Sequence, residues 1–183
     1  AGRLGIDTDL FGFARRVEDL VSYRQNVLSV IVPFNVGRAR VLGAEIAASV
    51  DWSRFLRTEL AMTLLDPRDT KAGRTLANAL LPFRSRLVLS DFTELYSESG
   101  LPALGVQRAA LGLRVTERTS RYADQAGLIV IPEQTVFDLE ARVAFFHRAL
   151  AARISFRNVF DAREVDGVGF PLPGRSAHAT LEG

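Results

Sequence analysis

Residues 40–52 read RVLGAEIAASVDW, and this stretch decides the fold. Apolar side chains occupy every second position, and small or acidic side chains occupy the positions between them. A period of two places the two sets on opposite faces of a β-strand. The apolar face comprises Leu42, Ala44, Ile46, Ala48, Val50 and Trp52, and the other face comprises Gly43, Glu45, Ala47, Ser49 and Asp51.

The same alternation returns along the whole chain. It is clear at residues 107–116, 135–145 and 150–156, and weaker at residues 11–21, 56–65, 83–93 and 177–182. The sequence therefore predicts about eight strands. Several run to about ten residues, which exceeds the usual length of strands in soluble sheets and matches a tilted membrane crossing.

A helix is the competing interpretation for residues 136–154, which lack Gly and Pro and are rich in good helix formers. A helix places Asp138 and Arg142 on one face and Glu140 roughly opposite. A strand places all three charges on one face and every apolar neighbour on the other. The strand accounts for more positions, so we predict a strand.

The polar faces of these strands carry charges of both signs, which can pair between neighbouring strands inside a barrel lumen. These residues are Glu45, Asp51, Arg57, Glu59, Arg86, Arg108, Arg114, Asp138, Glu140, Arg142, Arg153 and Arg157. The predicted fold class is all-β, an antiparallel transmembrane β-barrel whose apolar face meets lipid. A soluble β-sandwich with a charged outer face is the alternative. Aromatic residues near strand ends fit interfacial girdles; they are Tyr23, Trp52, Phe83 and Phe92.

Connections of two kinds separate the strands. Residues 66–69 and 161–163 are predicted as short polar turns, and residues 96–104 and 123–134 as longer loops. Short turns that alternate with longer loops are typical of an outer-membrane barrel.

Composition excludes several classes of function. Net charge is +2, from 23 Lys+Arg and 21 Asp+Glu spread along the chain, so no basic face for nucleic acid is predicted. Cysteine is absent, which excludes disulfides, thiolate metal sites and cysteine nucleophiles. The only histidines, His147 and His178, lie far apart, so neither a metal site nor any cofactor is predicted. No apolar run reaches the length of a transmembrane helix, and residues 1–5 do not form a signal peptide.

Catalysis is not predicted either. Glu45 with Glu59, and Asp138 with Glu140, could be read as acid–base pairs, but the polar wall of a lumen explains them better. Neither histidine has a nucleophile signature nearby, and no Gly-rich phosphate loop precedes a helix. The expected protein is not an enzyme.

Four stretches, in the same order along the chain, carry a resemblance to a known family. Residues 35–45 (NVGRARVLGAE) and 80–86 (LLPFRSR) resemble the patterns N-x-G-x-A-x-x-x-G-x-E and L-P-x-R-P-x-H, with Ser85 where Pro is common. Residues 157–161 (RNVFD) and 170–176 (FPLPGRS) resemble x-N-L-F-D and x-P-x-P-G-R-x. Together they resemble TonB-dependent outer-membrane receptors. The motif residues are Asn35, Gly43, Glu45, Asn158, Phe160, Asp161, Pro173, Gly174 and Arg175.

The resemblance implies a plugged barrel of roughly 22 strands, of which residues 1–183 form the C-terminal portion, with the plug domain absent from this chain. It implies active transport of a scarce ligand such as a ferric siderophore, haem or cobalamin across the outer membrane of a Gram-negative bacterium. The implied partners are the lipid bilayer, the iron chelate or similar ligand, and TonB through the missing N-terminal region.

The chain ends Thr180-Leu181-Glu182-Gly183, whereas the family usually ends on an aromatic residue, so we expect the chain to stop just before it. Two further functions stay open. One is a small complete outer-membrane barrel of about eight strands with a structural or adhesin role. The other is a soluble β-sandwich binding module.

The motif residues also have physical interpretations. Gly43 permits a close approach to the lumen wall or relieves curvature, Pro173-Gly174 is a turn signal, and Asn158 and Asp161 cap a tight turn. Ligand contacts are expected in the loops at residues 25–36, 70–81, 118–134 and 164–172. There Arg118, Arg121 and Tyr122 are the candidates to meet an anionic chelate, because Arg suits bidentate carboxylate contacts.

Overall fold

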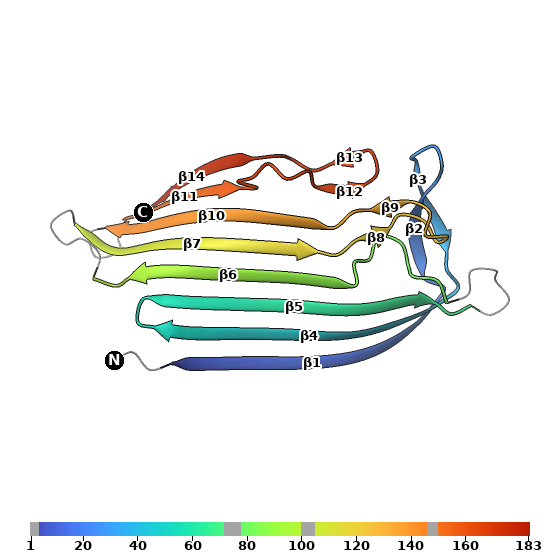
Figure 1. Ribbon diagram of the computed structural model, residues 1–183, viewed down its shortest axis with the longest axis horizontal. Helices are drawn as coiled ribbons and strands as arrows, with labels where there is room; N and C mark the ends of the chain where they lie inside the picture. Colours follow the sequence, from blue (N-terminus) through green and yellow to red (C-terminus); the bar gives the residue numbers. More distant parts are fainter. Residues whose placement is uncertain (1–3, 72–77, 100–104, 146–149) are drawn as a thin grey trace.

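A single antiparallel sheet of eight strands dominates the computed structural model, which describes residues 4–71, 78–99, 105–145 and 150–183. The strand order is β1-β4-β5-β6-β7-β10-β11-β14, so each long strand turns back beside the one before it (Figure 1). The long strands are β1 (Gly5–Glu18), β4 (Arg38–Ser53), β5 (Leu56–Asp69), β6 (Leu87–Ser97), β7 (Val106–Arg118), β10 (Gln134–Phe145), β11 (Leu150–Arg157) and β14 (Ser176–Glu182).

These eight strands confirm the number predicted from the alternation. The helical alternative for residues 136–154 is wrong, because the described part of this segment lies in β10 and β11. The prediction for residues 11–21 placed the first strand too late, since β1 begins at Gly5 and ends at Glu18. Strands of 14 and 16 residues, in β1 and β4, are longer than a tilted membrane crossing requires.

All the longer connections lie at one end of the sheet, here called the loop end. They are residues 19–37, 70–86, 119–133 and 158–175, whereas the other end, here called the turn end, has residues 54–55, 98–105 and 146–149 (Figure 1). Short and longer connections do alternate as expected, but two segments were assigned to the wrong kind. Residues 161–163, predicted as a short turn, belong to the longer connection 158–175, and residues 96–104, predicted as a longer loop, belong to the turn end, with residues 100–104 outside the described ranges. The predicted loops were not structureless, however. They contain three small hairpins, β2 (Val21–Gln25) with β3 (Ile31–Asn35), β8 (Arg121–Tyr122) with β9 (Val130–Ile131), and β12 (Val165–Gly167) with β13 (Phe170–Pro171).

Residues 66–69, predicted as a polar turn, instead continue β5 to Asp69. A proline is tolerated there because β6 pairs with β5 only as far as Leu64. Pro67 has no N–H to donate, and β6 offers no acceptor at this position, so no ladder hydrogen bond is lost. The Pro67 carbonyl accepts a hydrogen bond from the Leu81 N–H at 2.9 Å.

The strand predicted at residues 83–93 begins later, at Leu87. Phe83 has a φ of +59°, which is outside the strand region. Its N–H donates to the Tyr122 carbonyl at 2.7 Å, so a neighbouring loop fixes this segment in a turn.

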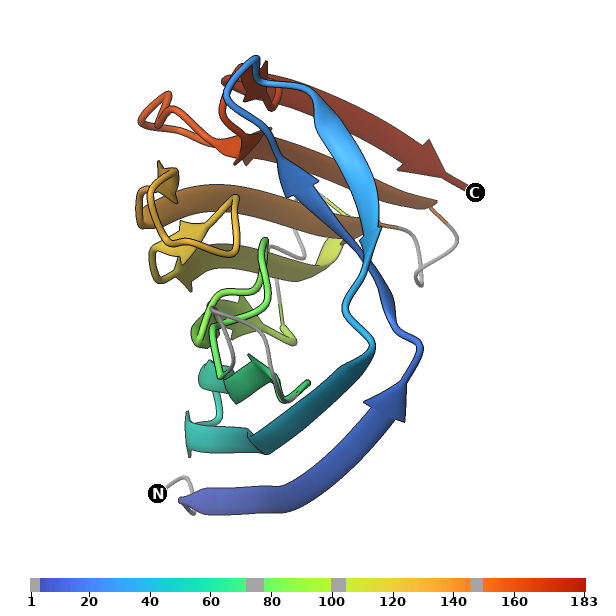
Figure 2. The same ribbon diagram turned by 90° about the vertical axis from the view of Figure 1, so that its right-hand side faces the viewer.

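The sheet curves into an arc, and hairpin β2–β3 crosses its concave side (Figure 2). Val36, Ala39 and Leu81 form a small buried core at the loop end, with Leu20 and Phe34 packed against it. Ala39 therefore faces the concave side, and so does every second residue of β4 from Ala39 through Glu45 to Asp51. The predicted polar face is the concave wall, except that Arg86 precedes β6 and lines a depression together with Leu42, Ala44 and Leu64 of the other face.

The convex face carries the apolar set and has nothing packed over it among the described residues. Leu10 is 76% exposed, Leu111 53% and Ile154 46%. In a soluble β-sandwich a second sheet covers such a face. The structure places no second sheet there, so the soluble-sandwich alternative is not supported.

The predicted aromatic girdle is only partly correct. Trp52 lies on the convex face at the turn end, where its indole Nε1 donates to Thr58 Oγ1 at 3.0 Å. Phe92 lies opposite Glu59 and Arg114 and thus faces the concave side. Tyr23 belongs to β2 and Phe83 to a loop. The expectation for Phe92 was wrong because an aromatic side chain can lie on either face of a strand, and its residue type alone does not reveal which.

The arc is open at both edges, because β1 pairs only with β4 and β14 pairs only with β11. The eight described strands thus do not close into a small complete barrel (Figure 2). Within the described ranges, no helix is long and apolar enough to cross a membrane.

Two aromatic rings lie flat against the concave wall over glycines. Phe92 covers Gly112, where an added Cβ would lie 2.6 Å from the ring, and the Arg114 guanidinium lies 4.7 Å from the centre of the same ring. Phe13 covers Gly43 in the same way. This contact explains the glycine of the first motif, since a side chain there would displace the ring.

Gly112→Ala is therefore expected to lower the free energy of unfolding of the full-length receptor by roughly 1–2 kcal/mol, because the new methyl displaces Phe92. Denaturant titration measures the effect. Gly12→Ala is the matched control, since an added Cβ there has no atom within 4 Å. Equal effects of the two substitutions would contradict the packing described, and Phe92→Leu should relieve the defect of Gly112→Ala.

Candidate functional site

Charges on the concave wall pair between strands, as the sequence predicted. Arg57 contacts Asp51 at 3.9 Å and Glu59 at 3.2 Å. Glu140 accepts hydrogen bonds from Arg142 on its own strand and from Arg153 on β11, the latter at 2.8 Å. Arg142 also contacts Glu94 on β6, at 3.4 Å. The wall thus carries charges of both signs at positions that the strands fix.

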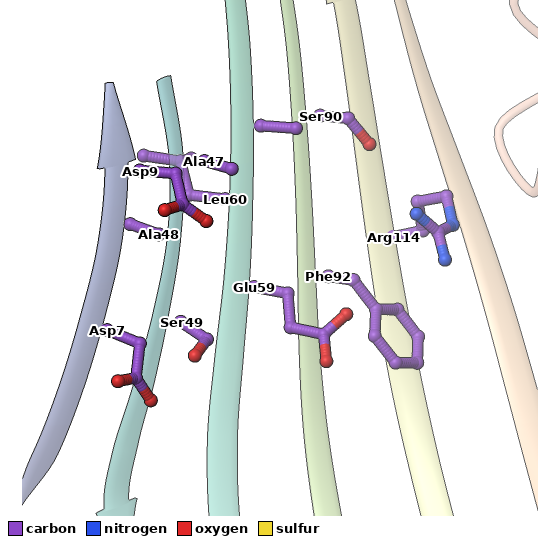
Figure 3. A pocket seen from close by; sticks show the side chains of 11 residues that line it. Asp7, Asp9, Ala47, Ala48, Ser49, Glu59, Leu60, Ser90, Phe92 and Arg114 are labelled. Carbon is purple, nitrogen blue, oxygen red and sulfur yellow. The ribbon is translucent and has the colours of Figure 1, made fainter. Parts of the chain in front are cut away.

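The wall is also electrically uneven. β1, β4 and β5 present mainly carboxylates, whereas β7, β10 and β11 present most of the arginines. Figure 3 shows the transition: Asp7, Asp9 and Glu59 line one side of a hollow of about 310 Å³, and Phe92 and Arg114 line the other. Whatever fills the lumen therefore meets negative charge on one side and positive charge on the other.

A larger pocket of about 700 Å³ lies at the loop end, between the concave wall and the small hairpins. Hairpin β2–β3, the loop before β6, the end of β7 and hairpins β8–β9 and β12–β13 all contribute to it. It is lined by Tyr23, Ile31, Leu65, Phe83, Arg84, Ser85, Val88, Arg118, Arg121, Asp166 and Phe170. Three aromatic rings, three arginines and one carboxylate thus converge at the mouth of the lumen.

Arg121 holds the shape of this pocket through hydrogen bonds to neighbouring segments. Only 7% of it is exposed, and its guanidinium donates to the Val165 carbonyl at 2.8 Å and to Gln134 Oε1 at 3.5 Å. Burial lowers the pKa of Arg121, as does the neighbouring charge of Arg118, while Asp166 opposes both effects. The side chain joins β8 to β12 and so fixes one wall of the pocket.

The other two predicted ligand residues differ in position. Arg118 lines the pocket and pairs loosely with Glu164 at 4.0 Å, so its guanidinium keeps donors available. Tyr122 does not line the pocket, and its ring packs against Gly127. Arg84, which is exposed and lines the pocket, was not predicted as a ligand contact, because its segment was assigned to the start of a strand rather than to a loop.

Gln25 ties the hairpins together across the mouth. Its side-chain oxygen accepts from the Val168 N–H at 3.0 Å and its amide donates to the Val168 carbonyl. Its own N–H donates to the Ala123 carbonyl at 2.8 Å. No pattern in the sequence marks Gln25, because Val168 lies 143 residues away.

The motif residues of the last loop build its turns. Asn158 Oδ1 accepts from the Ala162 N–H at 2.7 Å, and its amide donates to the Ala162 carbonyl at 2.8 Å. The Asn158 N–H donates to Asp138 on β10. Phe160 packs edge-on against Phe137, with ring centres 5.1 Å apart.

In two further turns a side-chain oxygen likewise accepts a hydrogen bond from a backbone N–H. Asp161 Oδ1 accepts from the Arg175 N–H at 2.9 Å and lies against Gly174, next to Pro173, so the third and fourth motifs meet in space. Asn35 Oδ1 accepts from the Gly37 N–H at 2.6 Å, where Gly37 has a φ of +81°. Glu45 faces the lumen on β4 without building a turn.

The remaining candidates do not assemble a reactive site. Glu59 and Glu140 are each held by arginine, and Asp138 accepts a backbone N–H. In the described part of the chain, no three metal-ligating side chains gather in one place. His178 lies on β14 within 3.3 Å of Ser176, and His147 lies outside the described residues.

Solved structures of similar shape include receptors and a transporter. The siderophore receptor PiuA from Acinetobacter baumannii has a TM-score of 0.70 at 16% identity, with 96% of this chain and 26% of that chain covered. The copper transporter OprC has a TM-score of 0.71 at 17% identity, with 96% and 28% covered. The ferric preacinetobactin receptor BauA from Acinetobacter baumannii has a TM-score of 0.69 at 13% identity, with 97% and 27% covered.

The chain thus spans about a quarter of the length of each of these proteins. No protein of curated function matches the sequence. A family model, described as "TonB dependent receptor-like, beta-barrel", matches residues 2–159, which is most of the chain. The members of that family are receptors and transporters of the Gram-negative outer membrane, not enzymes. The resemblance carried by the four motifs is confirmed: this chain belongs to the TonB-dependent receptor β-barrel family.

Proposed function

We propose that the chain is the C-terminal portion of an active-transport receptor that imports a scarce ligand across the outer membrane of a Gram-negative bacterium. The plug domain and the segment that contacts TonB belong to residues outside this chain. Ferric siderophores, haem and cobalamin are the candidate ligands. The observation that carries the proposal is the aromatic and cationic pocket at the mouth of a polar, concave wall.

The chemistry of this pocket suits a large ligand with negative oxygens. Tyr23, Phe83 and Phe170 offer flat apolar surfaces, and Arg84 and Arg118 offer forked donors to carboxylate or catecholate oxygens. Arg121 is engaged with backbone and holds the pocket's shape. Because each wall comes from a different segment, the pocket forms only when the loops have assembled.

Transport against a concentration gradient requires energy, which the outer membrane itself does not supply. TonB coupling meets that requirement, and the membership of the family supports it. The similar solved proteins are named for siderophores and for copper, which supports an import role. Because these names differ, the class of ligand is inferred from the residues that line the pocket.

In the full-length receptor, Arg84→Gln combined with Arg118→Gln is expected to weaken chelate binding by about tenfold or more, since charge-assisted hydrogen bonds are lost. Binding and uptake by whole cells are measured with a ferric catecholate, a ferric hydroxamate, ferric citrate, haem and cobalamin. Arg163→Gln, an exposed arginine outside the pocket, is the control.

An uncoupler of the proton gradient should stop uptake in this assay while cell-surface binding persists. Failure of every probe to bind the wild-type receptor, or unchanged binding by the pocket variant, would contradict the proposed pocket. Continued uptake with the uncoupler present would contradict the coupling.

A further inference from the structure

Three arginines lie side by side on the convex face near the loop end. Arg16 on β1 lies opposite Arg40 on β4, which lies opposite Arg68 on β5. They face away from the lumen because Arg40 follows the concave-facing Ala39 in the alternation of β4. Like charges placed directly opposite each other destabilise a sheet, so negative charge close to the row would stabilise it.

The protein supplies only part of that charge. Asp66 accepts from Arg68 Nε at 2.8 Å and contacts Arg40 Nη2 at 3.5 Å. Arg40 Nε has no hydrogen-bond partner within the described residues, and exposed Arg16 has no ion pair there. Exposed Arg86 also lies near Asp66, so the positive charge around this single carboxylate is in excess. The next pair along the strands, Arg38 with Glu18, neutralises itself.

The convex surface next to the row, on the side toward the turn end, is apolar and is formed mainly by small residues. Gly12 and Ala14 on β1 face Ala44 and Leu42 on β4, and the space above Gly12 is open. Beside them is a shallow depression of about 410 Å³, whose lining includes the apolar Leu42, Ala44 and Leu64 and also the charged Asp66 and Arg86. Cationic groups above a smooth apolar strip match a molecule with an anionic head and a hydrocarbon chain.

We propose that Arg16, Arg40 and Arg68 bind the phosphate of a phosphorylated membrane lipid, whose acyl chain lies along the strip of Gly12, Ala14 and Ala44. The forked guanidinium groups suit bidentate contact with phosphate oxygens. The excess of positive charge complements an anionic phosphate monoester. The inference rests on the proposed function in the outer membrane, where the convex face meets lipid and the loop end, with its longer connections, lies on the outer side.

Native mass spectrometry of the full-length receptor in detergent tests this assignment, with phosphatidate as the probe. Diacylglycerol of the same acyl chains and inorganic phosphate serve as the two comparison probes. The variant is Arg16→Gln combined with Arg40→Gln. The matched control is Arg15→Gln, which removes an exposed arginine one residue away on the opposite, concave face.

The wild-type receptor and the control are expected to retain phosphatidate at least about tenfold better than diacylglycerol, and the double variant to lose about tenfold of that binding. Arg16→Gln alone should lower phosphatidate retention a few-fold. This substitution is expected to leave the fold intact because Arg16 has no ion-pair partner in the described structure.

Equal phosphatidate retention by wild type and double variant would overturn the proposal. Displacement of phosphatidate by inorganic phosphate at equal concentration would show a free-phosphate site and would overturn the lipid assignment. Because no chelate or energy source enters this assay, its outcome is independent of whether the mouth pocket imports a ligand.

Discussion

In-register pairing of alternating strands is the constraint on which everything else depends. Every side chain of β4 keeps its face because Glu45 and Ser49 lie opposite Thr63 and Glu59 on β5. A slip of one residue would move these polar groups into the apolar face. Ion pairs such as Arg142 with Glu94 connect neighbouring or next-neighbour strands and oppose that slip. In lipid the constraint is stricter, because backbone groups find partners only in the adjacent strand.

The same pairing creates the mouth of the lumen. Because the strands are antiparallel and the turns at one end are short, all the longer segments gather at the loop end (Figure 1). Gln25 and Arg121 then join hairpins from distant parts of the chain through backbone carbonyls. These bonds give a pocket with fixed walls, in which Arg84 and Arg118 keep donors available to a ligand. On the opposite face, the arginine row marks the upper edge of the apolar band.

Local features of the fold were predictable from sequence, and features that depend on distant partners were not. Period-two alternation is a property of adjacent residues, so the number of long strands, the faces of β4, β7, β10 and β11, and the charge pairing of the wall were predicted correctly. Pro67 and Phe83 were misassigned because neighbouring segments decide their conformation. Within the site, Arg118 and Arg121 were found by charge and loop position, but the backbone-bound role of Arg121 and the whole contribution of Gln25 depend on distant residues.

The concave and convex faces of β4 are expected to meet different environments, water or protein on one and lipid on the other. Residues 1–183 contain no cysteine, so single cysteines at Ala47, Ala48, Ser49 and Val50 can each carry a nitroxide spin label in the reconstituted full-length receptor, once any cysteine elsewhere is replaced by serine. Electron paramagnetic resonance then measures collision with lipid-dissolved oxygen. We predict high oxygen accessibility at Ala48 and Val50 and low accessibility at Ala47 and Ser49. Equal accessibility at all four positions would contradict this assignment of the two faces.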